Sequence, residues 1–293
     1  MKTLFKAILL SSLAILTAVP SFAQSEKTIK RKVAIGRFSN ETTYGKGVFY
    51  DKENDPMGKQ ALDILSAKLA SSGKFILLER EDLDVLVSEG GAGMDKIGAD
   101  YVILGSLTSF GRKSEGHEKV FSSTKTQVVE AGVSLRLVDV ASRRIIYADE
   151  AKGSAETTSK TTLGLGGTSG FDATLSDKAI SAAMSQLVEN IINKCMDKPW
   201  RAYILTVDDG VYVVSGGTSQ GIASGDVFNV YRKGKMVTNP QTGIKIEMPG
   251  TKVGTVTVTQ CLGDTVDNEI SMCRYNGEAV DSAKLLDYYI SDK

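Results

Sequence analysis

The residues that most often carry enzyme chemistry are few in this chain and scattered along it. The 293 residues include one histidine and three cysteines. Metal sites and nucleophilic triads need several imidazoles, or one imidazole held beside a partner. His117 lies among Lys113, Glu115, Glu118 and Lys119, a setting that predicts an exposed loop. Nothing assembles an acid, a base and a nucleophile in one place, so we expect no enzyme activity and no cofactor.

Two patterns resemble ligand sites but lack an essential part. The acidic residues at 51, 53 and 55 alternate as calcium ligands do, yet Pro56 and Met57 stand where a calcium loop needs liganding geometry and glycine. The glycines between 216 and 225 resemble a phosphate-binding loop, but the β-rich run 227–231 follows them. A helix N-terminus is what makes such loops bind phosphate. We expect turns there and no metal site.

The cysteines predict structural roles. Cys195 ends a helical pattern and is expected to be a small buried hydrophobe. Cys261 and Cys273 lie close together in a region that predicts antiparallel strands. An exported protein can form disulfides, so a bridge between these two is one expectation and two free thiols are the other.

Composition and charge exclude several classes of protein. Hydrophobic residues make up 42% of the chain, which is ample for a core, and the length predicts about two domains. With 35 basic and 35 acidic residues the net charge is zero, and the basic cluster at 30–32 has no aromatic residues interleaved with it. We therefore expect no nucleic-acid partner.

The N-terminus has the pattern of a secretory signal peptide over residues 1–23. Lys2 and Lys6 precede an apolar run at 7–19, and Ser21 and Ala23 supply small residues before the expected cleavage. The run is shorter than the ~20 residues of a membrane-spanning helix. No cysteine lies near the cleavage site. We expect an exported protein of the periplasm or the periplasmic face of the outer membrane, and not a lipoprotein.

Residues 24–198 predict a sheet with helices packed on it. Strands are expected at 32–38, 75–78, 101–110, 128–140 and 143–148, the last two joined at Ala141–Ser142. Helices are expected from Pro56 with Asp55 as N-cap, over 80–89, and over about 177–195 with Ser176 as N-cap. Their core faces are Met57, Ala61, Ile64, Leu65 and Leu69 in the first and Ile180, Met184, Leu187, Val188, Ile191 and Ile192 in the last.

Pro199–Trp200 marks the start of a second domain at 199–293. Short β segments alternate there with turn signals, which is typical of a small all-β barrel. The predicted class is therefore α+β. A three-layer-like α/β domain with a mixed twisted sheet and packed helices, extended by β-hairpins, precedes a small barrel.

Two segments exceed what a plain globular domain requires. The even positions of 120–128 and the odd positions of 155–165 carry no charge, while Lys119 and Lys125 fall on the other face of the first segment and Glu156 and Lys160 on the other face of the second. This alternation is typical of membrane β-hairpins, and an exposed hairpin or β-extension is the alternative. The candidate membrane-facing residues are Val120, Thr124, Val128, Thr161, Leu163, Leu165, Phe171 and Leu175.

The run Phe75–Glu89, with Leu78-Glu79-Arg80 and Leu86 at its centre, resembles the curli secretion channel family (CsgG and relatives). Three further stretches match in the same order, at 40–42, 99–106 and 133–146. The resemblance covers about residues 32–195. It implies an α/β periplasmic domain that forms a homo-oligomeric ring, with each subunit giving two hairpins, Leu107–Ala131 and Ala151–Ser176, to a shared outer-membrane barrel.

The resemblance also implies a function. Such rings export unfolded, amyloid-forming subunits without ATP, so we expect a protein that forms or supports an oligomeric pore for surface fibre or adhesin subunits. Phe49, Tyr50 and Asn54 are the candidates for the pore constriction by residue type. The alternative is a soluble periplasmic adaptor or activator that binds other cell-envelope proteins.

Overall fold

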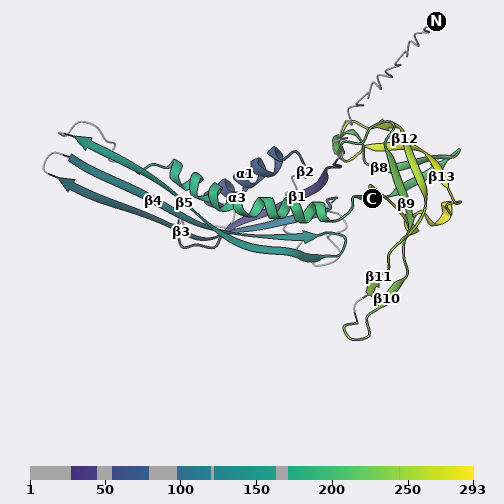
Figure 1. Cartoon of the computed structure of the whole chain (residues 1–293), viewed down its shortest axis with the longest axis horizontal. Coiled ribbons are helices and arrows are strands. Elements are labelled where there is room, and N and C mark those ends of the chain that lie inside the picture. Colours follow the sequence, from purple (N-terminus) through teal and green to yellow (C-terminus); the bar gives the residue numbers. More distant parts are fainter. Residues whose placement is uncertain (1–27, 45–54, 79–97, 120–121, 163–170, 244) are drawn as a thin grey trace, which may run out of the picture.

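Two β-sheets organise the part of the chain that the computed structural model describes (Figure 1). That part comprises residues 28–44, 55–78, 98–119, 122–162, 171–243 and 245–293. Several sequence-based expectations lie outside it, namely the signal peptide at 1–23, the helix at 80–89, and the candidates Phe49, Tyr50, Asn54, Val120, Leu163 and Leu165.

The first sheet has five strands in the order β2-β1-β3-β4-β5. β1 pairs in parallel with both β2 and β3, whereas β3, β4 and β5 pair antiparallel. The strands span β1 (Arg31–Asn40), β2 (Phe75–Leu78), β3 (Tyr101–Lys119), β4 (Ser122–Asp139) and β5 (Arg144–Thr162).

The last three of these strands are longer than the sequence predicts. The expected separate segments 101–110, 128–140 and 143–148 are parts of continuous strands of 19, 18 and 19 residues. The predicted turn at Ala141–Ser142 is confirmed, and the Ser142 N–H donates there to Asp139 Oδ1 at 2.7 Å. The polar, threonine-rich stretches 122–127 and 157–162 are continuous with the core strands, and the antiparallel backbone pairing of the core extends along both of them.

Helix α1 (Pro56–Ser71) begins where the sequence predicts. Asp55 Oδ1 accepts from the Gly58 N–H at 2.9 Å, which satisfies one of the free donors of the first turn. Asp55 Oδ2 accepts from the Asn40 N–H at 2.8 Å, so the same carboxylate ties the end of β1 to the start of the helix. Ala61, Leu65 and Leu69 are buried as predicted, and Met57 and Ile64 are partly buried.

Helix α3 (Thr174–Asp197) begins earlier than predicted, and the expected N-cap at Ser176 is wrong. Ala173 occupies the N-cap position and makes no side-chain cap bond, while Ser176 is a buried residue inside the helix. Asp172 supplies the missing interaction, since its Oδ1 accepts from the N–H and hydroxyl of Thr174 at 3.0 and 2.7 Å. These bonds hold the pKa of Asp172 below its usual value.

Both helices cover the same face of the five-stranded sheet and enclose the larger core. Its fully buried side chains come from the sheet and both helices, among them Leu65, Ile103, Leu107, Leu135, Leu137, Ile180, Met184 and Leu187. The opposite face carries only a small cluster built on Ala34, Val102 and Val138. In the described residues the arrangement therefore has two layers, where the sequence analysis expected three.

The second sheet has seven strands in the order β6-β14-β9-β12-β13-β8-β7. Its edge strands β6 and β7 are consecutive in the chain, so the sheet nearly closes on itself, as the predicted barrel would. Trp200, Phe228 and Val256 lie in its core with Ile29 from the segment before β1. The strands are β6 (Arg201–Ala202), β7 (Ile204–Asp208), β8 (Val211–Ser215), β9 (Val227–Arg232), β12 (Thr251–Leu262), β13 (Ile270–Gly277) and β14 (Tyr288–Ser291), with short 3-10 helices η2 (Thr218–Gln220) and η3 (Ser282–Asp287).

The start of β1 contacts the second sheet through buried polar groups. The Arg31 side chain is 5% exposed, and its guanidinium donates to the Lys198 carbonyl at 2.9 Å and lies 3.9 Å from Asp292. Lys32 Nζ donates to the Val266 carbonyl at 2.9 Å. Burying a charged side chain is costly unless it is paired, so these contacts position the two sheets relative to each other.

The three cysteines are free thiols in this structure. Of the two expectations for Cys261 and Cys273 the structure has the free thiols, because the β12–β13 register places Cys261 opposite Ser271 and Cys273 opposite Val258. Cys195 is fully buried, as predicted, and burial raises the pKa of its thiol to about 12. No helix in the described part of the chain combines the length and apolar character needed to cross a membrane.

Gly153 is expected to be the most sensitive position in the packing of α3 on β5. A Cβ added there would lie 2.3 Å from the Ala179 carbonyl oxygen and 2.4 Å from the Ala183 nitrogen, both in the helix backbone. We expect Gly153→Ala to lower the free energy of unfolding by about 1–3 kcal/mol, measured by urea denaturation. Gly111→Ala on β3 is the control, because its Cβ would meet nothing within 4 Å. Equal stability of the two variants would contradict this packing.

Candidate functional site

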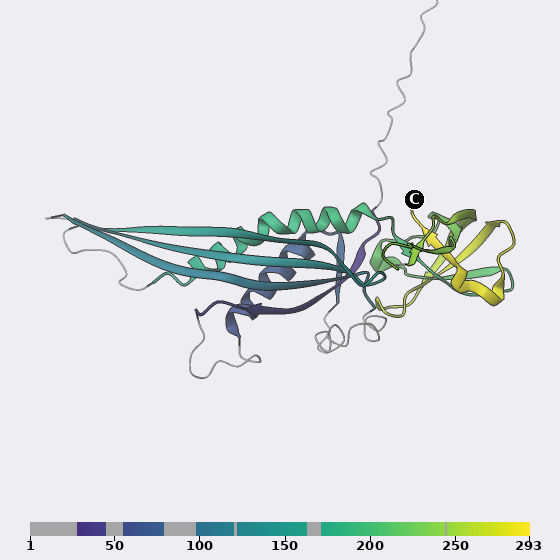
Figure 2. The same cartoon turned by 90° about the horizontal axis from the view of Figure 1, so that it is seen from below.

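The three long strands run beyond the helices and form an arm (Figure 2). β1 pairs with β3 only as far as Leu107, which stands opposite Asn40. Beyond that point β3, β4 and β5 pair only with one another in the described residues. We define the arm as residues 109–119, 122–132 and 153–162, whose base still includes Val129 and Ala131 of the main core and Gly153 beneath α3. It is the feature of the fold that a globular core does not require.

The strand register assigns every arm residue to one of two faces. Val129 stands opposite Ala155 and Gln127 opposite Thr157, so the odd positions of β4 and β5 share a face. This helix-side face, which continues the core beneath α3, carries Arg112, Ser114, Lys125, Gln127, Val129, Ala155, Thr157 and Ser159. The outer face carries Lys113, Glu115, Thr124, Thr126, Val128, Glu130, Glu156, Thr158 and Lys160.

This register corrects the membrane-facing surface expected from the sequence. The uncharged even positions of β4 and the uncharged odd positions of β5 lie on opposite faces of the sheet. Thr124 stands beside Lys160 and Val128 beside Glu156, whereas Thr161 stands opposite Ser123. Each uncharged row therefore shares its face with charged residues of a neighbouring strand, and the candidate residues do not form one apolar surface.

The second hairpin implied by the resemblance, Ala151–Ser176, also differs from the structure. β5 accounts for its outgoing strand, but the described residues that follow do not return as a strand. Leu175 is fully buried in the first turn of α3, and Phe171 packs against the main core. These two candidates therefore contribute to the core side of the arm in this structure.

Arg112 brings together three segments at the base of the arm. Its guanidinium carbon lies 4.6 Å from the ring centre of Phe171, 4.9 Å from Tyr44 and 5.6 Å from Phe110. Arg112 Nη2 donates to Ser176 Oγ at 2.9 Å, and the Tyr44 and Phe110 rings are 4.6 Å apart. Cation–π attraction of this kind favours a guanidinium placed among aromatic rings. We call these five residues the Arg112 cluster.

The Arg112 cluster fixes segments that lead to the expected constriction. Tyr44 precedes residues 45–54, and Asp55, which binds β1 and α1, follows them. Asn40 Nδ2 donates to the Tyr44 carbonyl at 2.9 Å, and Asn40 Oδ1 accepts from the Thr42 N–H at 3.0 Å. Both ends of the 45–54 segment are thus held at the carboxyl end of β1. The candidates Phe49, Tyr50 and Asn54 belong to the segment between them.

Sequence reasoning missed Arg112. It appears as one basic residue beside Lys113, with nothing to set it apart. A usable signal was the strand period, because Phe110 and Arg112 are two residues apart and so must share a face. Tyr44 and Phe171 are distant in sequence, and only the folded chain brings their rings to the guanidinium.

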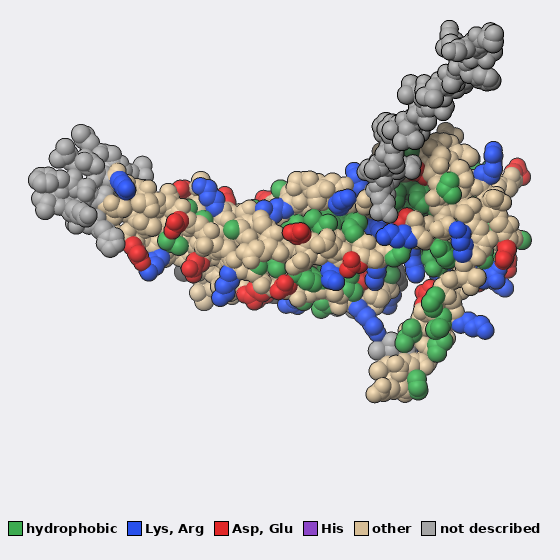
Figure 3. Space-filling view, viewed as in Figure 1, with side chains coloured by type: hydrophobic (Ala, Val, Ile, Leu, Met, Phe, Trp, Pro, Cys, Tyr) green, Lys and Arg blue, Asp and Glu red, His purple; other side chains and the backbone are tan. Residues whose placement is uncertain are grey.

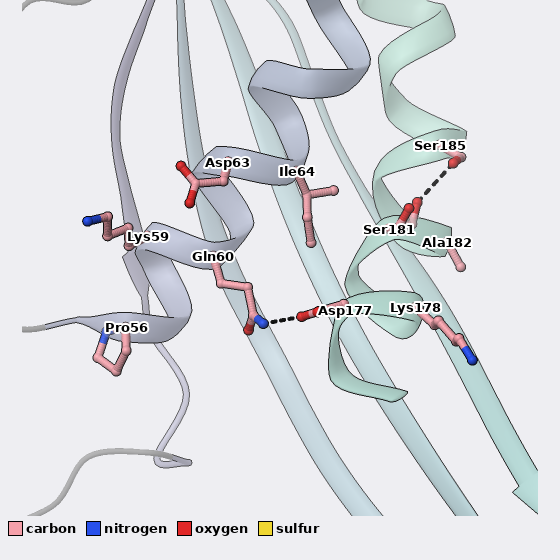
Figure 4. Close-up of a pocket in the computed structure, with 10 residues that line it drawn as sticks. All are labelled: Pro56, Lys59, Gln60, Asp63, Ile64, Asp177, Lys178, Ser181, Ala182 and Ser185. Atoms are coloured by element: carbon pink, nitrogen blue, oxygen red, sulfur yellow. Dashed lines mark hydrogen bonds between the residues drawn. The ribbon is translucent and has the colours of Figure 1, made fainter. Parts of the chain in front are cut away.

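An open groove of about 810 Å³ lies between α1 and α3 (Figure 4). Gln60 Nε2 donates to Asp177 Oδ1 across it, and Lys59, Asp63 and Lys178 also line it. Its two serines are Ser181 and Ser185, and the Ser185 hydroxyl donates to the Ser181 carbonyl at 2.8 Å and accepts from Lys68 Nζ at 2.8 Å. Among the described residues no group of His, Cys, Asp and Glu side chains is placed to hold a metal ion.

Replacement of Arg112 is expected to release the start of α3. We expect Arg112→Met to lower the free energy of unfolding by about 1 kcal/mol and to increase amide hydrogen exchange at 172–177, because the contacts to Phe171 and Ser176 are lost. Lys113→Gln is the control, since Lys113 is exposed on the outer face beside Glu115. Unchanged exchange in Arg112→Met would show that the cluster does not hold this segment.

Comparison with known proteins places the chain in a family. Residues 16–225 match the family described as Curli production assembly/transport component CsgG. A Neisseria meningitidis serogroup B (strain ATCC BAA-335 / MC58) protein named "Putative lipoprotein NMB1126/NMB1164" is 32% identical over 189 residues, which cover 62% of this chain and 84% of that protein. The three cysteines of the present chain, at 195, 261 and 273, all lie far from the expected cleavage site.

Solved structures give a weaker likeness. Lipoprotein GNA1162 from Neisseria meningitidis is 13% identical, with 57% of this chain and 99% of that chain covered and a TM-score of 0.29. The PelC dodecamer from Paraburkholderia phytofirmans is 16% identical, with 54% and 88% covered and a TM-score of 0.28. The sequence match spans well over half of the chain, and on that ground the chain belongs to the CsgG family of curli production assembly and transport components.

Proposed function

We propose that this chain is an oligomeric component of an envelope export apparatus, in which it forms or supports an outer-membrane pore for surface fibre or adhesin subunits. Membership of a transport family supports the general role. The observation that carries the proposal is the arm, which presents a strand edge on each side. β3 beyond Leu107 and β5 over its whole length have no second neighbour among the described strands.

Open strand edges of this length favour assembly. Each edge exposes a row of unpaired N–H and C=O groups, and monomeric proteins usually cover or interrupt such rows. β3 and β5 both run antiparallel to β4 and hence in the same direction. In a ring, β5 of one copy would meet β3 of the next in a parallel pair. Many copies would then share one continuous sheet around a central opening.

The charge on the arm bears on the role of that sheet. The helix-side face carries Arg112 and Lys125, and the outer face carries Lys113, Glu130 and Glu156 among others. Charged residues on a lipid-facing wall are costly near the middle of a membrane. We therefore favour a supporting ring at the periplasmic side of the pore. A bacterial pore wall of this kind has antiparallel neighbours throughout, whereas β5 and β3 of adjacent copies would meet in parallel.

The second candidate function is a periplasmic adaptor that binds other envelope proteins without forming a ring. The same charged residues on both faces of the arm favour it. The two functions differ in whether copies of the chain must associate.

Fractionation of expressing cells tests the proposal. We expect the chain in the envelope fraction as a complex several times larger than one subunit on an unheated gel. A pore wall would remain in carbonate-washed membranes as a heat-labile complex. A supporting ring would be released from the membranes by the carbonate wash, but the released complex would still be several times larger than one subunit. Recovery of a soluble single subunit would overturn the proposal and leave the adaptor function.

Substitutions on the β5 edge test the role of the arm in assembly. Lysine on an edge strand opposes the approach of another strand. We expect Ser154→Lys/Thr158→Lys to weaken self-association by about tenfold, measured by light scattering over a dilution series. Thr126→Lys/Ser134→Lys is the matched control, because it adds the same charge to the same face on the central strand β4. Equal behaviour of the two double variants would exclude the β5 edge as the interface.

A further inference from the structure

A small hairpin projects from the seven-stranded sheet, separate from both cores (Figures 1 and 3). β10 (Met236–Thr238) and β11 (Lys245–Glu247) pair only with each other in the described residues. Its large apolar side chains are about half exposed, at 57% for Met236, 49% for Val237, 49% for Ile246 and 47% for Met248. A two-stranded hairpin is marginally stable in water by itself, and exposed apolar surface of this kind is typical of a site that binds a partner.

The hairpin is amphipathic. Val237 stands directly opposite Ile246, so the two side chains share a face. Met248, whose N–H donates to the Lys235 carbonyl at 3.0 Å, lies two residues beyond Ile246 and continues that face together with Lys235. The opposite face carries Met236, Thr238, Lys245 and Glu247. One apolar face is thus left without a covering element among the described residues.

The charge around this face is positive. Residues 232–248 contain four basic side chains and one acidic one, namely Arg232, Lys233, Lys235, Lys245 and Glu247. The acidic Glu247 lies 3.9 Å from Arg201, and Arg232 lies 3.7 Å from Glu278. Lys235 and Lys245 belong to none of the ion pairs found among the described residues. Their aliphatic stems allow the ammonium groups to reach past an apolar contact.

We propose that the β10–β11 hairpin lies on the surface of an anionic phospholipid bilayer. Val237, Ile246 and Met248 enter the boundary between headgroups and acyl chains, Lys235 on the same face contacts lipid phosphates, and Lys245 on the opposite face adds to the attraction through its charge. Apolar side chains flanked by lysines are the combination that binds such a surface, since apolar burial and electrostatic attraction add. The contact is peripheral and independent of the arm.

A second copy of the chain fits the hairpin less well. The groove between α1 and α3 is the large concave feature described above, and its charged lining residues are Lys59 and Lys178 with Asp63 and Asp177. Equal numbers of opposite charges give no attraction for a lysine-rich hairpin. A bilayer supplies a uniformly negative surface, and it adapts to a twisted ribbon without requiring a complementary shape.

Vesicle flotation tests this inference with the full exported chain purified from the cell envelope. We expect binding to vesicles of equal parts phosphatidylcholine and phosphatidylglycerol, weaker binding to pure phosphatidylcholine, and a decrease at high salt. Val237→Ser/Ile246→Ser should weaken the binding by about tenfold or more, because two apolar contacts are lost. Lys235→Gln/Lys245→Gln should remove most of the difference between the two vesicle types.

Thr238→Ser on the opposite face of the hairpin is the matched control and should bind as the unaltered chain does. Circular dichroism and thermal melting verify that the variants keep the seven-stranded sheet. Absence of binding to the anionic vesicles would overturn the inference. Binding that Val237→Ser/Ile246→Ser leaves unchanged would also overturn it, because another surface would then be responsible. Capture of an acidic protein by the hairpin without any vesicle binding would assign the face to a protein partner and reject the bilayer.

Discussion

The register between β4 and β5 is the constraint on which the rest of the structure depends. One ladder, shifted once between Leu137 and Val138, runs from Asp139 opposite Arg144 to Ser122 opposite Thr162. At the core end it is fixed by packing, since Val133, Leu135 and Leu137 must face the helices. The side-chain period of a strand is two, so this choice determines the face of every residue out to the tip of the arm. The packing of the core therefore decides which face of the arm each side chain occupies.

Helix α3 maintains that register through a close backbone contact with β5 and through polar contacts near both of its ends. Gly153 lets the helix backbone reach β5, and Tyr101 donates to the Cys195 carbonyl at 3.3 Å near the end of the helix. Arg112 binds the first turn through Ser176. The same arginine packs on Tyr44, at the start of the 45–54 segment. Arg112 therefore joins the arm both to α3 and to Tyr44.

The family assignment indicates a transport component, and the structure changes the expectation of how the arm could serve that role. A lipid-facing wall needs one continuous apolar face. Here the uncharged rows of β4 and β5 lie on opposite faces of the sheet, and Thr124 stands beside Lys160 and Val128 beside Glu156. Such an arm is better suited to association through its edges than to insertion through its faces. Any contact with a bilayer is more readily made by the short apolar hairpin of the second sheet.

Local patterns in the sequence determined much of this protein. Asp55 and Pro56 specify the start of α1, the apolar stripe from Ile180 to Ile191 specifies the buried face of α3, and the runs at 75–89 and 99–106 identify the family. Each of these depends on neighbours within a turn or a strand. The relation between strands was decided only by the tertiary structure, because pairing joins residues far apart in the chain and a register cannot be derived from one strand alone. For the same reason the sequence did not predict that Ser176 lies inside α3 and binds Arg112. Nor did it predict that Cys261 stands opposite Ser271 and Cys273 opposite Val258.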